Sequence, residues 1–195
     1  DGCTQAGFRG VNVTYPFKEE VMRHVAIADP VQAAIGSCNT VVFGMPASSG
    51  ANTDFSGFIK AFRETFRSAS PGRVAIAGAG GVGKAIAFAL GVLKADHLAI
   101  YDTDAGKVEA LRAALKTCFP ALPTRAPSSI DAAMEEAEGL LNCTPHGMDR
   151  IGGSAFPAER LDGSVWAFDA VYTPVETAFV QAARQAGLAT MTGYE

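Results

Sequence analysis

The hexapeptide Gly78-Ala79-Gly80-Gly81-Val82-Gly83 lies between a short apolar run at residues 73–77 and an amphipathic stretch. The apolar run predicts a strand, and the stretch after it predicts a helix whose apolar face holds Val82, Ile86, Leu90 and Leu93. In such a unit the first glycine permits a tight turn, the second lets the backbone approach a pyrophosphate, and the third lets helix and strand pack closely. The motif therefore predicts a dinucleotide site at a helix N-terminus, the alternative being a glycine-rich turn without a ligand.

The chain downstream of this motif alternates between strand-like and helix-like segments. Short apolar runs predict further strands at residues 97–101, 139–142, 165–168 and 188–191. Helical patterns occupy residues 105–115 and 174–186. This alternation predicts an α/β fold, a Rossmann-type doubly wound parallel sheet with helices on both faces.

The chain upstream of the motif has a different pattern. Residues 8–14 and 39–43 are β-like, residues 44–50 form a Gly/Ser-rich turn, and Pro16 suits the first turn of a helix over residues 18–25. Thr53 or Asp54 is expected to cap a further helix with an aromatic and aliphatic stripe: Phe55, Phe58, Ile59, Phe62 and Phe66. Residues 68–72 read as a linker.

Composition restricts the partners and the compartment. Of the 195 residues, 48% are hydrophobic and 18% charged, as in a soluble globular chain, and the net charge of -4 argues against a nucleic-acid partner. Residues 31–53 carry no charge, but their polar residues and glycines exclude a membrane span. No signal peptide is visible, and four scattered cysteines predict free thiols in the cytoplasm. These cysteines and three isolated histidines form no metal-binding pattern.

An acidic residue ends the strand that follows the glycine motif. Asp102 lies 19 residues after Gly83, where a carboxylate can accept hydrogen bonds from the adenosine ribose and repel a 2′-phosphate. Thr103 stands where an NADP enzyme would need arginine. Asp102 could instead cap a helix, although Asp104 is better placed to do so. The pattern therefore favours NAD. NADP is less favoured, but it stays an alternative because Lys107 could reach a 2′-phosphate.

Neither Lys18 nor Asp54 indicates a catalytic role when it is considered alone. A lysine just after a strand could transfer a proton, yet a lone lysine on an amphipathic helix usually faces solvent. Asp54 alone would more often be a helix cap than a catalytic group.

Taken together, ordered segments along nearly the whole chain resemble the shikimate/quinate dehydrogenase family. They are residues 10–18 (GVNVTYPFK), 34–42 (AIGSCNTVV), 52–58 (NTDFSGF), 78–83, 142–148 (NCTPHGM) and 169–174 (DAVYTP) with Thr177.

The resemblance implies two domains with a substrate cleft between them. We expect an N-terminally incomplete, smaller α/β substrate domain at 1–57, a connecting helix and linker at 58–72, and an NAD-binding Rossmann domain at 73–195. The implied site residues are the catalytic pair Lys18 and Asp54, the substrate-binding residues Thr14, Asn39 and Tyr172, and the cofactor-lining residues Gly78, Ala79, Gly80, Gly81, Val82, Gly83, Asp102, Asn142, Cys143, Thr144, Ala170 and Gly193.

The implied reaction is the reversible oxidation of the C3 hydroxyl of quinate or shikimate to a ketone, with hydride passing to NAD. A dry cleft would favour a neutral Lys18 and Asp54 would oppose it. Which of the two accepts the proton stays open, and a hydrogen-bonded Lys18–Asp54 pair describes the site better than a single base. His146 is expected to be a loop residue rather than a ligand.

The sequence leaves the extent of the chain, two alternative functions and the oligomeric state to be considered. Hydroxyl residues that the family places near its N-terminus would precede Asp1, and a glutamine would follow Glu195, so we expect a fragment. The alternatives are an NADP-dependent biosynthetic shikimate dehydrogenase, with Lys107 or Arg112 at the 2′-phosphate, and a non-catalytic dinucleotide-sensing homologue. The oligomeric state is undetermined, with a homodimer as one option, and no membrane or nucleic-acid partner is expected.

Overall fold

The C-terminal two thirds of the chain form a six-stranded parallel sheet. The computed structural model describes residues 2–14, 16–67 and 69–194. The strands are β4 (Arg73–Ala77), β5 (His97–Tyr101), β6 (Thr124–Arg125), β7 (Gly139–Asn142), β8 (Trp166–Asp169) and β9 (Ala189–Thr192). Their spatial order is β6-β5-β4-β7-β8-β9, so the direction of winding reverses between β4 and β7. The predicted doubly wound sheet is confirmed, and its switch point lies at the carboxyl ends of β4 and β7.

Helices cover both faces of this sheet. One face packs against α3 (Thr53–Phe66), α4 (Gly81–Val92) and α5 (Ala105–Cys118), and these elements share one buried apolar cluster. A second cluster on the other face includes α6 (Ile130–Met134) and α7 (Ala178–Gln185), with the short 3-10 helix η2 (Ala158–Arg160) beside α7. The central strands are therefore buried on both sides, which explains their nearly continuous apolar sequences.

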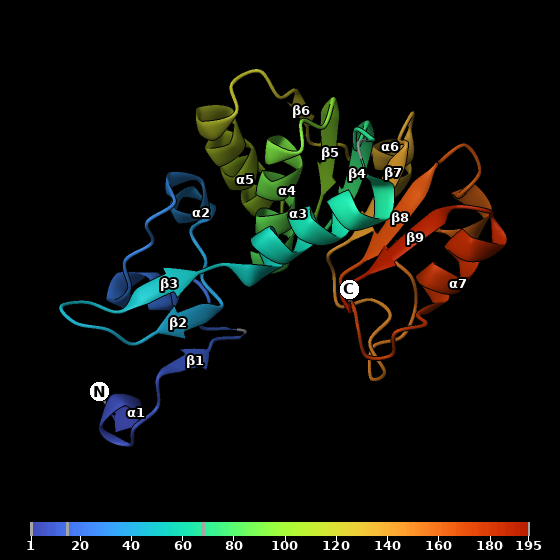
Figure 1. Ribbon diagram of the computed structural model, residues 1–195. Helices are drawn as coiled ribbons and strands as arrows, with labels where there is room; N and C mark the ends of the chain where they lie inside the picture. The colour runs from blue at the N-terminus through green and yellow to red at the C-terminus, as the bar shows by residue number, and fades with distance from the viewer. Residues whose placement is uncertain (1, 15, 68, 195) are drawn as a thin grey trace.

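The N-terminal part contains a small antiparallel sheet of β1 (Gly10–Asn12), β2 (Thr40–Val42) and β3 (Ser49–Ala51). Around it lie α1 (Gly2–Gln5), the 3-10 helix η1 (Glu20–His24) and α2 (Pro30–Ile35). Figure 1 shows α3 running from this small sheet to the large one.

Aromatic side chains anchor α3 on the large sheet. The ring of Phe58 meets that of Phe168 edge-on at 4.9 Å between centroids, and Phe62 meets Trp166 at 5.2 Å. Both phenylalanines are buried, so the predicted apolar stripe faces the Rossmann core rather than the small sheet. The N-terminal end of α3 is thereby fixed relative to the large sheet.

Several short elements differ from the sequence-based expectations. Residues 16–19 form a turn, and only η1 follows it, so the helix expected over residues 18–25 is wrong. Strand β3 forms at the end of the Gly/Ser-rich segment that was expected to be a turn, because its backbone pairs with β2, Gly50 opposite Val41. A side chain at Gly50 would overlap Val25. Helix α7 starts at Ala178, later than expected, since Thr177 caps it. Elements α2, β6 and α6 were not expected. None of the helices in the described part of the chain combines the length and apolar character needed to cross a membrane.

Candidate functional site

The three motif glycines are required for three different reasons. Gly78 has a φ of 101°, and a Cβ there would lie 2.7 Å from the carbonyl oxygen of Cys143. A Cβ on Gly83 would overlap the carbonyl oxygen of Gly78, so the third glycine lets α4 pack on the turn. A Cβ on Gly80 would meet nothing within 4 Å. Gly80 therefore borders open space beside the N-terminus of α4, where a phosphate group would find free N–H groups.

Asp102 is held against the glycine-rich turn. Its carboxylate accepts a hydrogen bond from the backbone N–H of Ala79 at 2.7 Å and another from that of Asp104 at 2.9 Å. The Thr103 hydroxyl also donates to the Asp102 carboxylate, at 3.5 Å. A carboxylate has about four acceptor positions, so one remains for a ribose hydroxyl, and a second becomes available if the Thr103 hydroxyl turns away. Asp104, as expected, caps α5 by accepting from the N–H groups of Gly106 and Lys107.

The two cations considered for a 2′-phosphate are already paired. Arg112 donates to both carboxylate oxygens of Glu109, at 2.8 and 3.0 Å, and to the side chain and carbonyl of Thr124. Lys107 lies 3.9 Å from the Asp104 carboxylate and is more than half exposed. Arg112 would have to break several hydrogen bonds to serve a phosphate, which leaves only Lys107 available.

Lys18 and Asp54 form a hydrogen-bonded ion pair. The Lys18 Nζ lies 2.7 Å from Asp54 Oδ2, and their side chains are only 17% and 28% exposed. Asn39 donates its Nδ2 to the other oxygen, Asp54 Oδ1, at 3.0 Å. The Asn39 Oδ1 in turn accepts from the backbone N–H of Thr53 at 2.8 Å, which fixes the orientation of the amide. Three residues predicted for the site thus form one polar cluster.

Asp54 is free for this pairing because another residue caps α3. The Asn52 side chain accepts from the N–H of Phe55, so the expected cap at Thr53 or Asp54 is wrong. Asn52 is fully buried and also donates to Ser37. Asp54 then lies in the first turn of α3, where the helix dipole favours a carboxylate.

The Lys18 segment lies against the glycine-rich turn. A Cβ on Gly81 would lie 3.6 Å from Lys18 Cδ, so the lysine stem passes over the start of α4. The next residue, Glu19, forms an ion pair with Lys84 in the first turn of α4 at 2.5 Å. Glu19 and Lys84 are not among the residues predicted for the site. Their only signal in the sequence is that two opposite charges each directly follow a motif.

The other residues expected at the cofactor lie at the ends of β7, β8 and β9. Asn142 ends β7, and its carbonyl accepts from the N–H of Ala170 at 2.9 Å. The N–H of Gly193 donates to Asp169, and a Cβ on Gly193 would lie 2.7 Å from the Ala170 carbonyl oxygen. Thr144 donates both its N–H and its hydroxyl to the Asn142 side chain.

Cys143 directly follows β7. Burial raises the pKa of its thiol, and the carboxylates of Asp169 and Asp54 act in the same direction. A thiol that stays protonated is a poor nucleophile, so we expect Cys143 to contribute its backbone rather than its sulfur atom.

Thr14 and Tyr172, both predicted to bind substrate, lie outside the hydrogen-bonded cluster of Lys18, Asn39 and Asp54. Both side chains are exposed, Tyr172 by 64%. No hydrogen bond joins either side chain to Lys18, Asn39 or Asp54 in the ranges that the structure describes. Their predicted contact with a substrate therefore stays a prediction. His146 is an exposed loop residue, as expected, and no cluster of three metal-ligating side chains occurs within the described ranges.

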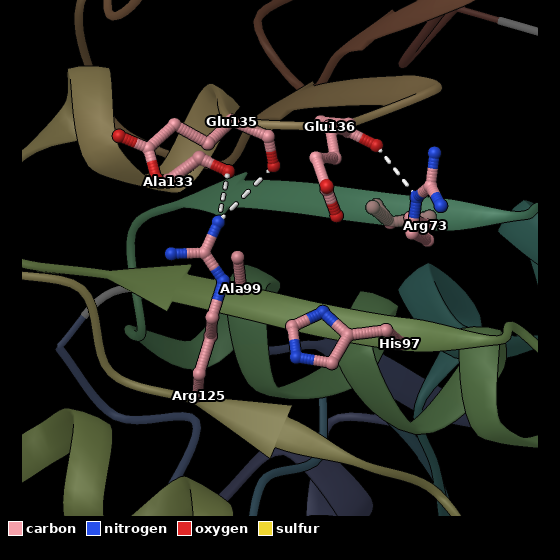
Figure 2. Close-up of a pocket in the computed structure, with 9 residues that line it drawn as sticks. Arg73, His97, Ala99, Arg125, Ala133, Glu135 and Glu136 are labelled. Carbon is pink, nitrogen blue, oxygen red and sulfur yellow. Dashed lines mark hydrogen bonds between the residues drawn. The ribbon is translucent and has the colours of Figure 1, made fainter.

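An open pocket of about 750 Å³ lies at the amino ends of β4 and β5, on the side of the large sheet away from the glycine-rich turn (Figure 2). Arg73 and His97 begin β4 and β5, and Arg125 ends β6. The arginines donate to backbone carbonyls, Arg73 to Glu136 and Arg125 to Ala133 and Glu135. The pocket is remote from the glycine-rich turn, because the turn follows the other end of β4.

His97 in this pocket gives the protein a predicted pH dependence. Burial lowers its pKa, Arg125 and Arg73 add to that effect, and Glu136 opposes it. As the pH falls below about 6.5, the unfolded chain takes up a proton before the folded protein does. The free energy of unfolding is therefore expected to fall from pH 7 towards pH 5.5, and His97→Gln to flatten that decline in urea titrations. The exposed His24, changed to Gln, is the control; equal flattening by both variants would contradict the assignment.

Comparison with known proteins agrees with this architecture. A family profile described as the shikimate dehydrogenase substrate binding domain matches residues 1–41. Shikimate dehydrogenase (NADP(+)) of Streptomyces avermitilis is 36% identical over 96% of this chain, which spans 65% of that protein, slightly less than two thirds. Quinate/shikimate dehydrogenase (NAD(+)) of Corynebacterium efficiens is 35% identical over 99% of this chain and 69% of its own length.

Solved structures give the same result. Quinate dehydrogenase from Corynebacterium glutamicum in complex with NAD matches with a TM-score of 0.87 and 33% identity, over 97% of this chain and 68% of that one. Shikimate 5-dehydrogenase from Thermus thermophilus, in complex with NADP(H) and shikimate, has a TM-score of 0.81 and 31% identity over 97% and 69% of the two chains.

The sheet order and the glycine-rich turn define a doubly wound α/β protein of the Rossmann class. Within that class, the identity and coverage of the Corynebacterium relatives assign the chain more narrowly. The chain belongs to the shikimate dehydrogenase family, which includes quinate/shikimate dehydrogenases.

Proposed function

We propose that the protein is an NAD-dependent dehydrogenase that reversibly oxidises the C3 hydroxyl of quinate or shikimate to the 3-dehydro ketone. The observation that carries the proposal is the Lys18–Asp54 pair, joined at 2.7 Å and lying over the start of α4. A proton-handling pair is thereby next to the place where a dinucleotide would lie, and alcohol oxidation needs both functions together.

The residues at the turn fit a dinucleotide. Gly80 borders open space at the N-terminus of α4, and Asp102 keeps an acceptor position for a ribose. Bound NAD would supply the hydride acceptor. Backbone groups at Cys143, Ala170 and Gly193 are proposed to line its nicotinamide half, because they follow strands at and beside the switch point.

The polar cluster would hold the substrate hydroxyl and move its proton. Lys18 can donate a hydrogen bond to the reacting oxygen while Asp54 shares the proton that leaves it. Asn39 holds Asp54 in place through Oδ1 and so keeps Oδ2 directed at the lysine. Thr14 and Tyr172 are proposed to bind other polar groups of the substrate. We also propose the division of the chain at residues 57 and 72, with α3 continuous across the first boundary, and a cytoplasmic location.

Four steady-state assays test the proposal: quinate and shikimate, each with NAD and with NADP. We expect turnover with at least one substrate and a higher kcat/KM with NAD, because Asp102 repels a 2′-phosphate. Activity only with NADP would contradict the cofactor assignment. An absence of turnover with either substrate, in a folded protein that binds NAD, would contradict the proposed reaction.

Asp102→Asn removes the negative charge and, with it, one of the two oxygens that accept hydrogen bonds from Ala79 and Asp104. Asparagine keeps an acceptor for the Ala79 N–H but loses the repulsion of a phosphate. The hydrogen bonds that the charged carboxylate would accept from the ribose of NAD contribute about 1.5–3 kcal/mol. Without that charge, the preference for NAD over NADP is expected to narrow by roughly tenfold or more. The ratio of the two Kd values measures it. Asp104→Asn is the matched control, since asparagine caps a helix as well as aspartate does; an equal change in that variant would sink the argument.

A further inference from the structure

Two buried polar residues lie opposite each other at the ends of neighbouring strands. Asn142 ends β7 and Asp169 ends β8, and the two are paired in the register of the parallel sheet. Both are completely buried. The Asn142 Nδ2 donates to Asp169 Oδ1 at 2.9 Å, so the two strand ends are joined by side chains as well as by the backbone ladder.

The Asp169 carboxylate also holds the loop that follows its own strand. Its Oδ1 accepts from the backbone N–H of Val171 at 3.0 Å, which fixes the chain just before Tyr172. Its Oδ2 accepts from the hydroxyl of Thr177 at 2.6 Å. Thr177 caps α7 by accepting from Val180, so one carboxylate closes the whole loop over residues 170–177.

The same network reaches the loop after β7. Asn142 Oδ1 accepts from the N–H and the hydroxyl of Thr144, at 3.0 and 2.7 Å, and its Nδ2 donates to the carbonyl of His146 at 2.8 Å. A Cβ on Gly147 would lie 3.1 Å from the Thr177 methyl group, so the two loops also pack together. The backbone carbonyl of Asp169 accepts from Gly193 at 2.8 Å and adds the segment after β9.

We propose that Asp169 is a positioning residue: through Asn142 and Thr177 it holds the three loops that present Cys143, Thr144, Ala170, Gly193 and Tyr172 to the reacting end of the site. The inference rests on the proposed dehydrogenase function. Asp169 itself is buried behind these loops and touches neither substrate nor cofactor. Its effect is therefore confined to the nicotinamide half, because Asp102 and Gly80 at the adenosine half follow β5 and β4 and make none of these hydrogen bonds.

A carboxylate is costly to bury, which suggests that its particular chemistry is needed. Burial raises the pKa of Asp169, and hydrogen bonds from Thr177, Val171 and Asn142 oppose that rise. All three partners donate, and only a carboxylate accepts on both oxygens. Asparagine has the same shape but offers one acceptor; with that acceptor kept for Val171 and Asn142, its NH₂ group faces Thr177. The Thr177 hydroxyl would then lose the acceptor for its proton.

Three variants separate positioning from general damage. Asp169→Asn and Thr177→Val break the same link from opposite sides, whereas Thr177→Ser keeps the hydroxyl and is the conservative rescue. Thr177→Val also removes the cap of α7. Ser129→Ala is the matched control for that loss, because Ser129 caps α6 on the same face of the sheet without touching the network.

The measurements are kcat at saturating cofactor, the Kd of NADH and the Kd of ADP-ribose, which reports on the adenosine half. We expect Asp169→Asn and Thr177→Val each to lower kcat by roughly tenfold to a hundredfold, as misplaced reacting groups do. The Kd of ADP-ribose should stay at the wild-type value. The double variant should be no slower than either single one, because residues in one link are not additive. Thr177→Ser and Ser129→Ala should keep wild-type kcat.

Two results would overturn the proposal. One is wild-type kcat in both Asp169→Asn and Thr177→Val. The other is loss of ADP-ribose binding in proportion to kcat, which would mean that the network only supports the fold. Failure of the proposed function is recognised separately, as a wild-type protein with no turnover. The Kd values then decide: weakened NADH binding with unchanged ADP-ribose binding supports positioning, and equal values in wild type and variants refute it.

Discussion

Replacing Lys18 with methionine is expected to lower kcat by a factor of roughly 10²–10⁴, the usual contribution of a positioned proton-transfer group. Methionine keeps an unbranched stem that can lie over Gly81, but it removes the ammonium group that pairs with Asp54 at 2.7 Å. Affinity for NAD should be unchanged, because the lysine amine contacts Asp54 rather than the turn. Steady-state kinetics and NADH fluorescence titration measure the two effects.

Lys60→Met is the matched control for this change. Lys60 lies on the same helix as Asp54, but its side chain is 76% exposed and forms an exposed ion pair with Glu64. Its removal should leave kcat unaltered, since an exposed ion pair contributes little. Activity that persists in Lys18→Met would remove the lysine from the mechanism, and a sensing homologue would then explain the chain better.

Gly83→Ala is expected to destabilise the fold by about 3 kcal/mol, the upper part of the usual range for inserting a group into a packed interior. The added methyl would overlap the backbone carbonyl of Gly78, which cannot rotate away as a side chain could. A chain of this length should lose roughly 6–12 °C in Tm. Urea and thermal unfolding followed by the single tryptophan would measure the loss.

Gly80→Ala separates packing from ligand binding. A methyl there meets nothing within 4 Å, and its φ of -75° suits alanine, so stability should fall by about 1 kcal/mol or less. The methyl would occupy the space beside α4 that a pyrophosphate needs, and NAD affinity should fall by roughly tenfold or more. Equal stability losses in the two variants, or unchanged NAD binding in Gly80→Ala, would contradict these roles.

The large sheet was predictable because its signals are local. Strands β4, β5 and β7 are apolar runs bounded by turn residues, and their observed bounds match the expected ones. The glycine spacing predicted the strand–turn–helix unit, since a backbone this tight excludes side chains at Gly78 and Gly83. Asp104 as the cap of α5 followed from its position alone.

Short elements were missed because tertiary contacts stabilise them. Strand β6 has two residues, and α6 has five, too few for a periodic pattern. Strand β3 contains glycine, which weakens a strand in isolation, and it forms because its backbone pairs with β2. Val25 and Cys38 leave no room for a side chain at Gly50. The same reasoning explains the cap of α3: Asn52 competes successfully with Thr53 and Asp54 because Ser37 holds its amide.

The site was predictable in its parts but not in its connections. Lys18, Asn39 and Asp54 were candidates on their own motifs, and the structure brings them into hydrogen-bond contact. No local pattern identifies the members of the Glu19–Lys84 pair or of the Asn142–Asp169 pair as partners, because they lie 65 and 27 residues apart in the chain.

The sequence by itself determined the main strands and helices of the large sheet, the glycine-rich turn and the acid that follows β5, since each depends on a few consecutive residues and their steric limits. Only the tertiary structure decided which polar groups meet. Side chains such as Asp54 and Asp169 become a paired and a buried carboxylate when distant segments exclude water around them, and no local pattern records which partners will supply the hydrogen bonds.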